Sequence, residues 1–145
     1  MADEAVEGVV KLQVVTPAGL AVDTTTPLAT LSGVEGDFGV MEGHAPFFTT
    51  LRPGALRYDE GGMPRAVAVS GGFVEVTQGK VIVLARTCEK PGQIDVERAR
   101  KSKTDAEETL ASMGHEDEKR KYYETRLMRA EARLEVAAGE KDYGG

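Results

Sequence analysis

The residues best suited to chemistry gather in a glycine-rich stretch, residues 33–46, which holds three carboxylates and a histidine. Glu35, Asp37, Glu42 and His44 are residue types that can bind a metal ion or transfer protons. Their spacing matches no known set of metal ligands. The stretch also lacks the Lys-Ser/Thr ending and the following helix of a phosphate-binding loop, and its carboxylates would repel phosphate. The residues alone therefore favour an exposed structural loop, and we expect no metal site.

The single cysteine, Cys88, excludes a disulfide within the chain. A catalytic thiol needs a histidine beside it in the fold, and the two histidines, His44 and His115, lie in no recognisable signature. We interpret Cys88 as a small apolar side chain. Because paired catalytic groups and nucleophile motifs are also absent from the sequence, we expect the chain itself not to be an enzyme.

Composition narrows the class of protein. The 145 residues are 41% hydrophobic and 29% charged, which is typical of a globular domain. The net charge of -6 argues against a nucleic-acid partner or attraction to anionic lipid. No apolar run approaches the roughly 20 residues of a membrane span, and the acidic N-terminus is unlike a signal peptide. We therefore expect a cytoplasmic protein without direct membrane insertion.

The chain changes character near Gln93. All six prolines precede that point, and residues 94–138 hold a single glycine, Gly114. The first part reads as about ten short valine-rich strands separated by turns such as Gly61-Gly62, which predicts a β-sandwich or flattened barrel. The fold class is therefore α+β. We place the β-sandwich head at residues 1–90, a C-terminal antiparallel helical hairpin at 91–138 and a flexible tail at 139–145.

Two helical stripes predict the hairpin. The members of the first recur at steps of three and four, and so do those of the second. They are Val96, Ala99, Lys103, Ala106, Leu110 and Met113 in the first stripe, and Tyr123, Leu127, Ala130, Leu134 and Ala137 in the second. We expect Gly114 to cap the first helix at its C-terminal end. Because several seam positions are alanine, the hairpin should bury little apolar area and could open.

Several motifs, taken together, resemble one family. They occur in collinear order over about residues 10–137. They are GDFG at 36–39, EGHAP at 42–46, LRPG at 51–54, SGGFVEV at 70–76 and IDVERA at 94–99. In this order they resemble the epsilon subunits of bacterial F-type ATP synthases. That family combines a β-sandwich with a helical hairpin, which agrees with the pattern read from the residues.

The resemblance implies a role in a rotary complex. It implies binding to the gamma subunit and to the ring of c subunits, on the cytoplasmic side of the bacterial inner membrane as a peripheral protein. Coupling of ion-driven rotation to ATP synthesis follows from those contacts. The positions that match the family's ring-facing region are Asp37 and His44. The glycine-shaped acidic loop is compatible with this role without requiring it.

The resemblance also implies that the hairpin regulates. Opened and extended along gamma, it would reach the alpha/beta catalytic head and obstruct ATP hydrolysis. The basic residues Lys119, Arg126, Arg129 and Arg133 fall on one face of the second helix. That face is either solvated and paired within the helix, or it contacts acidic surfaces of the head.

A third element implied by the resemblance is a regulatory ATP site. No cofactor is required. Asp95, Arg98 and Ala99 match a nucleotide-binding motif of some bacterial members, and Arg129 and Arg133 occupy similar positions on the second helix. The alternative is that Asp95 and Arg98 simply start a helix.

One competing interpretation belongs to a different class. A free-standing β-barrel built around the glycine-rich loop and His44 could bind a ligand or act as an enzyme, with its helices serving as a dimerisation tail. It predicts a deep pocket and helices that pair between chains. The short connection at Gly114 favours pairing within one chain.

Overall fold

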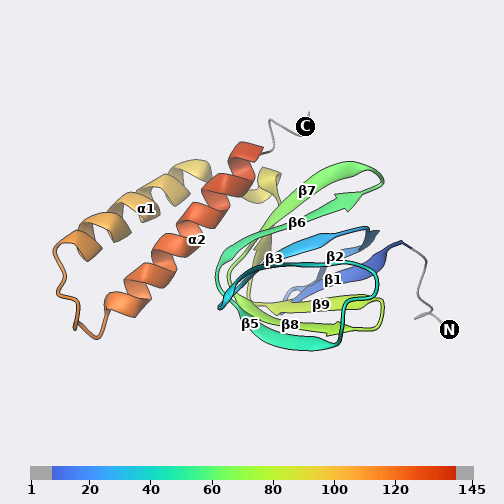
Figure 1. Cartoon of the computed structure of the whole chain (residues 1–145). Coiled ribbons are helices and arrows are strands. Elements are labelled where there is room, and N and C mark those ends of the chain that lie inside the picture. Colours follow the sequence, from blue (N-terminus) through green and yellow to red (C-terminus); the bar gives the residue numbers. More distant parts are fainter. Residues whose placement is uncertain (1–7, 140–145) are drawn as a thin grey trace.

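A computed structural model describes residues 8–139 as a β-sheet head followed by two helices (Figure 1). The α+β class and the helical hairpin predicted from the sequence are confirmed. The strands are β1 (Val10–Thr16), β2 (Gly19–Thr26), β3 (Ala29–Gly33), β4 (Gly36–Val40), β5 (Phe47–Leu51), β6 (Gly54–Glu60), β7 (Met63–Val69), β8 (Gly72–Thr77), β9 (Lys80–Ala85) and β10 (Cys88–Glu89). A 3₁₀ turn, η1 (Pro91–Gln93), leads into α1 (Val96–Ala111) and α2 (Arg120–Gly139).

The ten strands form one sheet that folds over on itself. Its order is β10-β7-β6-β3-β5-β8-β9-β1-β2, and β4 pairs with β3 outside this path. Neighbouring strands are antiparallel except β1 and β9, which pair in parallel with Leu12 opposite Val81. Alternate residues point inward, as period-two strands require. The largest buried side chains of the head are Val10, Leu12, Val14, Thr26, Leu31, Val40, Val67, Val74, Val76, Val81 and Val83.

Glycines fix two sharp features of the sheet. Gly61 and Gly62 have φ values of +59° and +83° in the two-residue connection between β6 and β7. Left-handed residues at both central positions suit the twist of a tight hairpin, so the turn predicted there is confirmed. Gly72 starts β8 where a side chain cannot fit, because an added Cβ would lie 2.0 Å from the carbonyl oxygen of Leu84.

The glycine-rich stretch differs from the loop expected from its sequence. Residues 36–40 form β4, which pairs with β3 so that Phe38 lies opposite Leu31. The turn between them is tight, with Gly33 paired to Gly36, and Gly36 has a φ of +129°. Because glycine adopts this backbone conformation without strain, the chain can reverse within residues 33–36 and form a β-hairpin.

The helices begin and end through local hydrogen bonds. Asp95 caps α1, and its Oδ1 accepts a hydrogen bond from the backbone N–H of Arg98 at 3.1 Å. The expected cap at Gly114 is wrong: α1 ends at Ala111 with Ser112 as its C-cap, and Gly114 does not have a positive φ. The flexible tail predicted at 139–145 lies outside the described residues except for Gly139, which ends α2.

Helix α2 lies between α1 and the sheet (Figure 1). Its Ala132 and Val136 pack on Ala66 and Ala68 of β7 and on Ile94, which is a second small apolar cluster. The helix-to-helix contact is also built from small side chains, and Ala99, Ala106 and Ala130 are buried. Such residues allow close approach but bury little area. Within residues 8–139, neither helix is long and apolar enough to cross a membrane.

Candidate partner-binding and nucleotide-binding sites

Basic residues from both helices line one open groove. Arg98 of α1 faces Arg129 and Arg133 of α2 across a hollow of about 650 Å³. The same three arginines also line an adjoining hollow of about 340 Å³, which reaches the head at Ser70, Thr87 and Glu89. The hairpin must be folded back for α1 and α2 to present these side chains together. The remaining residues along the groove are Lys101, Ser102, Asp105, Tyr122, Arg126 and Ala130.

The arginines of the groove differ in how they are held. Arg133 is half-buried and its Nε lies 2.8 Å from Oε1 of Glu89, while its Nη2 donates to Oε2 at 3.3 Å. The Nε of Arg126 donates to the hydroxyl of Ser102 on α1 at 3.1 Å. Arg98 and Arg129 are exposed and form no ion pair with any side chain in residues 8–139. Two guanidinium groups are therefore available to fork onto a phosphate chain.

Asp95 and Ala99, the other two residues of the predicted nucleotide motif, have structural roles in α1. The carboxylate of Asp95 is used to cap α1. Ala99 is fully buried, so it permits close packing and cannot reach a ligand in the groove. The prediction from the sequence did not include Glu89, which is 44 residues from Arg133 in the chain, or Lys101. Lys101 follows Arg98 by three positions, a spacing that places both on one helix face.

The structure places Asp37 and His44 in different surroundings. Asp37 on β4 forms an exposed ion pair with Arg52 and lines a hollow beside α2. The His44 ring lies 6.1 Å from the ring of Phe47, and its Nδ1 is 2.6 Å from the carbonyl oxygen of Ala45. No hydrogen bond or ion pair joins the two residues in the described part of the chain. The two residues flank β4, with Asp37 near its start beside α2 and His44 beyond its end, so they do not form one site.

An apolar row crosses the outer face of five adjacent strands. It consists of Phe48 on β5, Phe73 on β8, Leu84 on β9, Val15 on β1 and Leu20 on β2. The rings of Phe48 and Phe73 stack at 6.0 Å, and Phe73 lies opposite Leu84. Val15 pairs with both Leu84 and Leu20. Phe48 is 64% exposed and Leu84 51%, which is an unusual concentration of apolar surface.

The remaining reactive groups offer no catalytic arrangement. Burial raises the pKa of the Cys88 thiol to about 11, whereas a nucleophilic cysteine has a lowered pKa. Across the part of the chain that the structure describes, no three His, Cys, Asp or Glu side chains gather as a metal site would need. The geometry is that of surfaces and grooves for binding.

Comparison with known proteins gives the family. Residues 9–91 match the family described as ATP synthase, Delta/Epsilon chain, beta-sandwich domain. Residues 93–138 match the ATP synthase, Delta/Epsilon chain, long alpha-helix domain. The ATP synthase epsilon chain of Anaeromyxobacter sp. (strain K) is 44% identical over 126 residues, which cover 87% of this chain and 96% of that protein. That of Trichlorobacter lovleyi is 41% identical over 127 residues, covering 88% and 92%.

Solved structures agree. A chain in the Euglena gracilis mitochondrial ATP synthase, OSCP/F1/c-ring, aligns with a TM-score of 0.75 at 26% identity, over 94% of this chain and 85% of that one. A chain of the Tetrahymena thermophila mitochondrial ATP synthase central stalk and c ring shares the fold, with a TM-score of 0.57 at 13% identity, over 92% and 99% of the two chains. The chain therefore belongs to the family of ATP synthase epsilon chains, non-catalytic subunits of the central stalk of F-type ATP synthases.

Proposed function

We propose that this subunit binds the gamma subunit and the c ring through its head, and so couples ion-driven rotation to ATP synthesis. The observation that carries the proposal is the apolar row, because a surface of this kind is normally covered by a protein partner. We assign the row to gamma. Bacterial relatives of the chain support a position on the cytoplasmic side of the inner membrane, held there peripherally by the complex.

The c ring is assigned to β4 and the segments that flank it, because the resemblance to the family points to Asp37 and His44 there. At the start of β4, Asp37 and Arg52 present an exposed ion pair beside α2. The turn beyond β4 presents His44 beside the exposed ring of Phe47, and it also carries the exposed side chain of Met41. The amide N–H of Gly8 donates to the carboxylate of Glu42 at 2.7 Å, which fastens this turn to the N-terminal segment. A mixed polar and apolar surface on a fixed backbone suits contact with the loops of a ring.

The hairpin is assigned a regulatory role. In the folded-back state α2 rests on β6 and β7 through alanine and valine contacts and through ion pairs with Arg57 and Glu89. Little apolar area holds it, so its release needs a modest free energy. Extended along gamma, α2 would carry its basic face to the alpha/beta catalytic head and obstruct hydrolysis.

We assign regulatory ATP binding to the groove between the helices. Arg98 and Arg129 supply uncommitted guanidinium groups, and Arg133 supplies a third that is shared with Glu89. Because the groove exists when α1 and α2 lie together, bound ATP would stabilise the folded-back hairpin by mass action. Asp105 also lines the groove, so the site is less positive than its arginines alone suggest.

Co-purification from membranes in mild detergent tests the central proposal. The double variant Phe48→Ser/Phe73→Ser should lose gamma, because it removes the stacked centre of the apolar row. Met63→Ser is the matched control, since Met63 is an exposed apolar residue on β7 of the same head, outside the row. Retention of gamma by the double variant, with both proteins folded, would contradict the assignment.

The ring assignment has a separate readout. Asp37→Ala/His44→Ala should leave gamma binding intact and weaken proton pumping by the reconstituted complex. Unchanged pumping would remove both residues from the ring-facing surface.

A further inference from the structure

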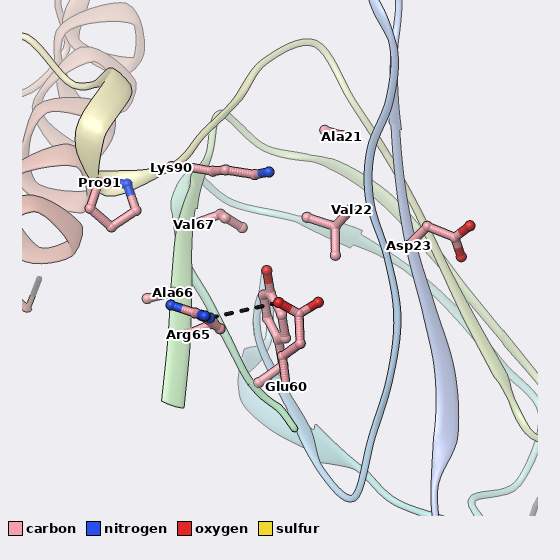
Figure 2. Close-up of a pocket in the computed structure, with 10 residues that line it drawn as sticks. Ala21, Val22, Asp23, Glu60, Arg65, Ala66, Val67, Lys90 and Pro91 are labelled. Atoms are coloured by element: carbon pink, nitrogen blue, oxygen red, sulfur yellow. Dashed lines mark ion pairs between the residues drawn. The ribbon is translucent and has the colours of Figure 1, made fainter. Parts of the chain in front are cut away.

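The sheet of the head does not close into a barrel, and a cavity lies between its two end strands. The strand path ends with β2 on one side and with β7 and β10 on the other. Between β2 and β7 lies a cavity of about 450 Å³ (Figure 2). β10 pairs with β7 only at Ala68 and Val69. In the described part of the chain, residues 63–67 of β7 therefore form an unpaired edge beside this cavity.

One end of the gap is shut. The backbone N–H of Asp59 on β6 donates to the hydroxyl of Thr26 on β2 at 3.0 Å. Thr26 is fully buried, and its hydroxyl donates in turn to the carbonyl oxygen of Leu28 at 2.9 Å. This joint ties β2 to β6, so the cavity is a wedge. An added β-strand would need to run through the closed end, which favours a small molecule as the occupant.

Both apolar and polar side chains line the wedge. Val22 and Val67 are buried core residues that line the cavity from β2 and β7, and Figure 2 shows both beside it. Tyr58 also lines it. Its hydroxyl is a neutral hydrogen-bond donor near pH 7, as in any tyrosine, and burial, reinforced by the charge of Glu60, raises its pKa further to about 12.

The charged groups of the wedge leave one cation uncommitted. Arg65 Nε lies 3.7 Å from Oε1 of Glu60. Asp23 accepts a hydrogen bond from the neutral side-chain amide of Gln13 at 3.3 Å and keeps its charge, but Figure 2 shows its carboxylate pointing away from the cavity. Lys90 forms no ion pair with another side chain in residues 8–139, and Figure 2 shows its side chain reaching across the cavity towards Val22. A single free ammonium group at an apolar wedge is suited to one negative charge.

From this arrangement we propose that the wedge binds a small organic monocarboxylate. Its carboxylate pairs with Lys90, and its short apolar body lies between Val22 and Val67. The cavity falls within the size range of small-molecule sites, which combine apolar walls with a few polar groups. Glu60 disfavours a dianion such as phosphate, because its carboxylate borders the same space.

Titration of the full chain with sodium hexanoate tests the proposal by amide NMR shifts. We expect saturable shifts at Val22 and Val67 in the millimolar range. Hexanol, which has the body without the charge, and inorganic phosphate, which has the charge without the body, should each bind more weakly. Lys90→Met should weaken hexanoate binding by about fivefold, the effect of one exposed ion pair. Lys90→Arg should retain binding.

Lys121→Met is the matched control, because Lys121 is exposed on α2 away from the wedge. It should bind hexanoate as the unmodified chain does. The proposal is overturned if no saturable shift occurs at the two valines. Equal affinity for hexanol or for phosphate would also overturn it, as would unchanged affinity in Lys90→Met.

Discussion

Arg133 on α2 and Glu89, the last residue of the sheet, form an ion pair that joins the hairpin to the head. Nη2 donates a hydrogen bond to Oε2 at 3.3 Å, and Nε lies 2.8 Å from Oε1 without the alignment of a hydrogen bond. Both side chains are about three-quarters buried, with 25% and 28% exposed, so water screens the pair less than a surface pair. The same arginine lines the groove assigned to ATP. One residue therefore serves both the closure of the hairpin and its proposed ligand.

Removing the charge of Glu89 should loosen the folded-back hairpin. We expect Glu89→Gln to increase transient release of α2 by about fivefold, because a partly exposed ion pair contributes about 1 kcal/mol. Hydrogen exchange of α2 amides in the isolated subunit measures the release. Glu97→Gln is the control, since Glu97 pairs with Arg100 inside α1 and does not touch the head. Identical exchange in the two variants would show that the pair does not hold the hairpin.

Binding of ATP should depend on the arginines that have no partner. Arg98→Ala and Arg129→Ala should each lower ATP affinity by about tenfold or more, since a charged hydrogen bond to phosphate contributes about 1.5–3 kcal/mol. Calorimetry on the isolated subunit is the measurement. Arg100→Ala is the matched control, because Arg100 lies on α1 outside the groove and pairs with Glu97. Absence of heat from the unmodified chain at millimolar ATP would mean that Asp95 and Arg98 serve only to start α1.

The sequence predicted the elements that depend on local patterns. Alternating valines mark β1 and β9, and the Gly61-Gly62 pair marks a hairpin turn, because each rests on neighbouring residues. The parallel pairing of β1 with β9 joins segments about 70 residues apart, and no local pattern carries that information.

The face of α2 that packs on the sheet could not be predicted from a local pattern. The predicted stripe passes through Ala130, which is buried, and ends at Ala137, which packs on the edge of the cluster at the head. Ala132 and Val136 form a second buried face, which packs on Ala66 and Ala68. Alanine is compatible with both buried and exposed helix positions, so this face has no hydrophobic pattern of its own. The Arg133 and Glu89 pair was invisible for the same reason, since it depends on how α2 docks.

Removal of the hairpin should leave the head folded. A chain ending at Lys90 keeps β10 and exposes Ala66 and Ala68, whose lost contacts cost about 1–2 kcal/mol at roughly 0.8 kcal/mol per methyl group. If the hairpin obstructs rotation, the complex with this chain should hydrolyse ATP faster than the intact complex. A chain lacking just residues 140–145 is the control, because α2 ends at Gly139. Equal hydrolysis rates for all three would exclude the hairpin as a brake.

Stability at alkaline pH should depend on Cys88. Burial raises the pKa of its thiol from 9.0 to about 11 in the folded chain, with the nearby Glu89 and Lys90 acting in opposite directions. Below pH 9 the thiol is protonated in both states, so it makes no difference to stability. Between pH 9 and 11 the unfolded chain loses this proton while the folded chain keeps it, and the free energy of unfolding therefore falls as the pH rises.

At pH 10 the two pKa values correspond to at most about 1.4 kcal/mol, and we expect about 1 kcal/mol because Cys88 is only partly buried. Cys88→Ala should therefore lose about 1 kcal/mol less than the unmodified chain between pH 7.5 and pH 10, whatever its starting stability. Urea unfolding at the two pH values measures the change. The hydroxyl of Tyr58 already ionises at pH 10 in the unfolded chain, where its pKa is 10.0, whereas in the folded chain its pKa is about 12. This loss of stability occurs in both proteins, so it does not account for the difference between them. Equal losses in the two proteins would show that the thiol is not shielded in the folded chain.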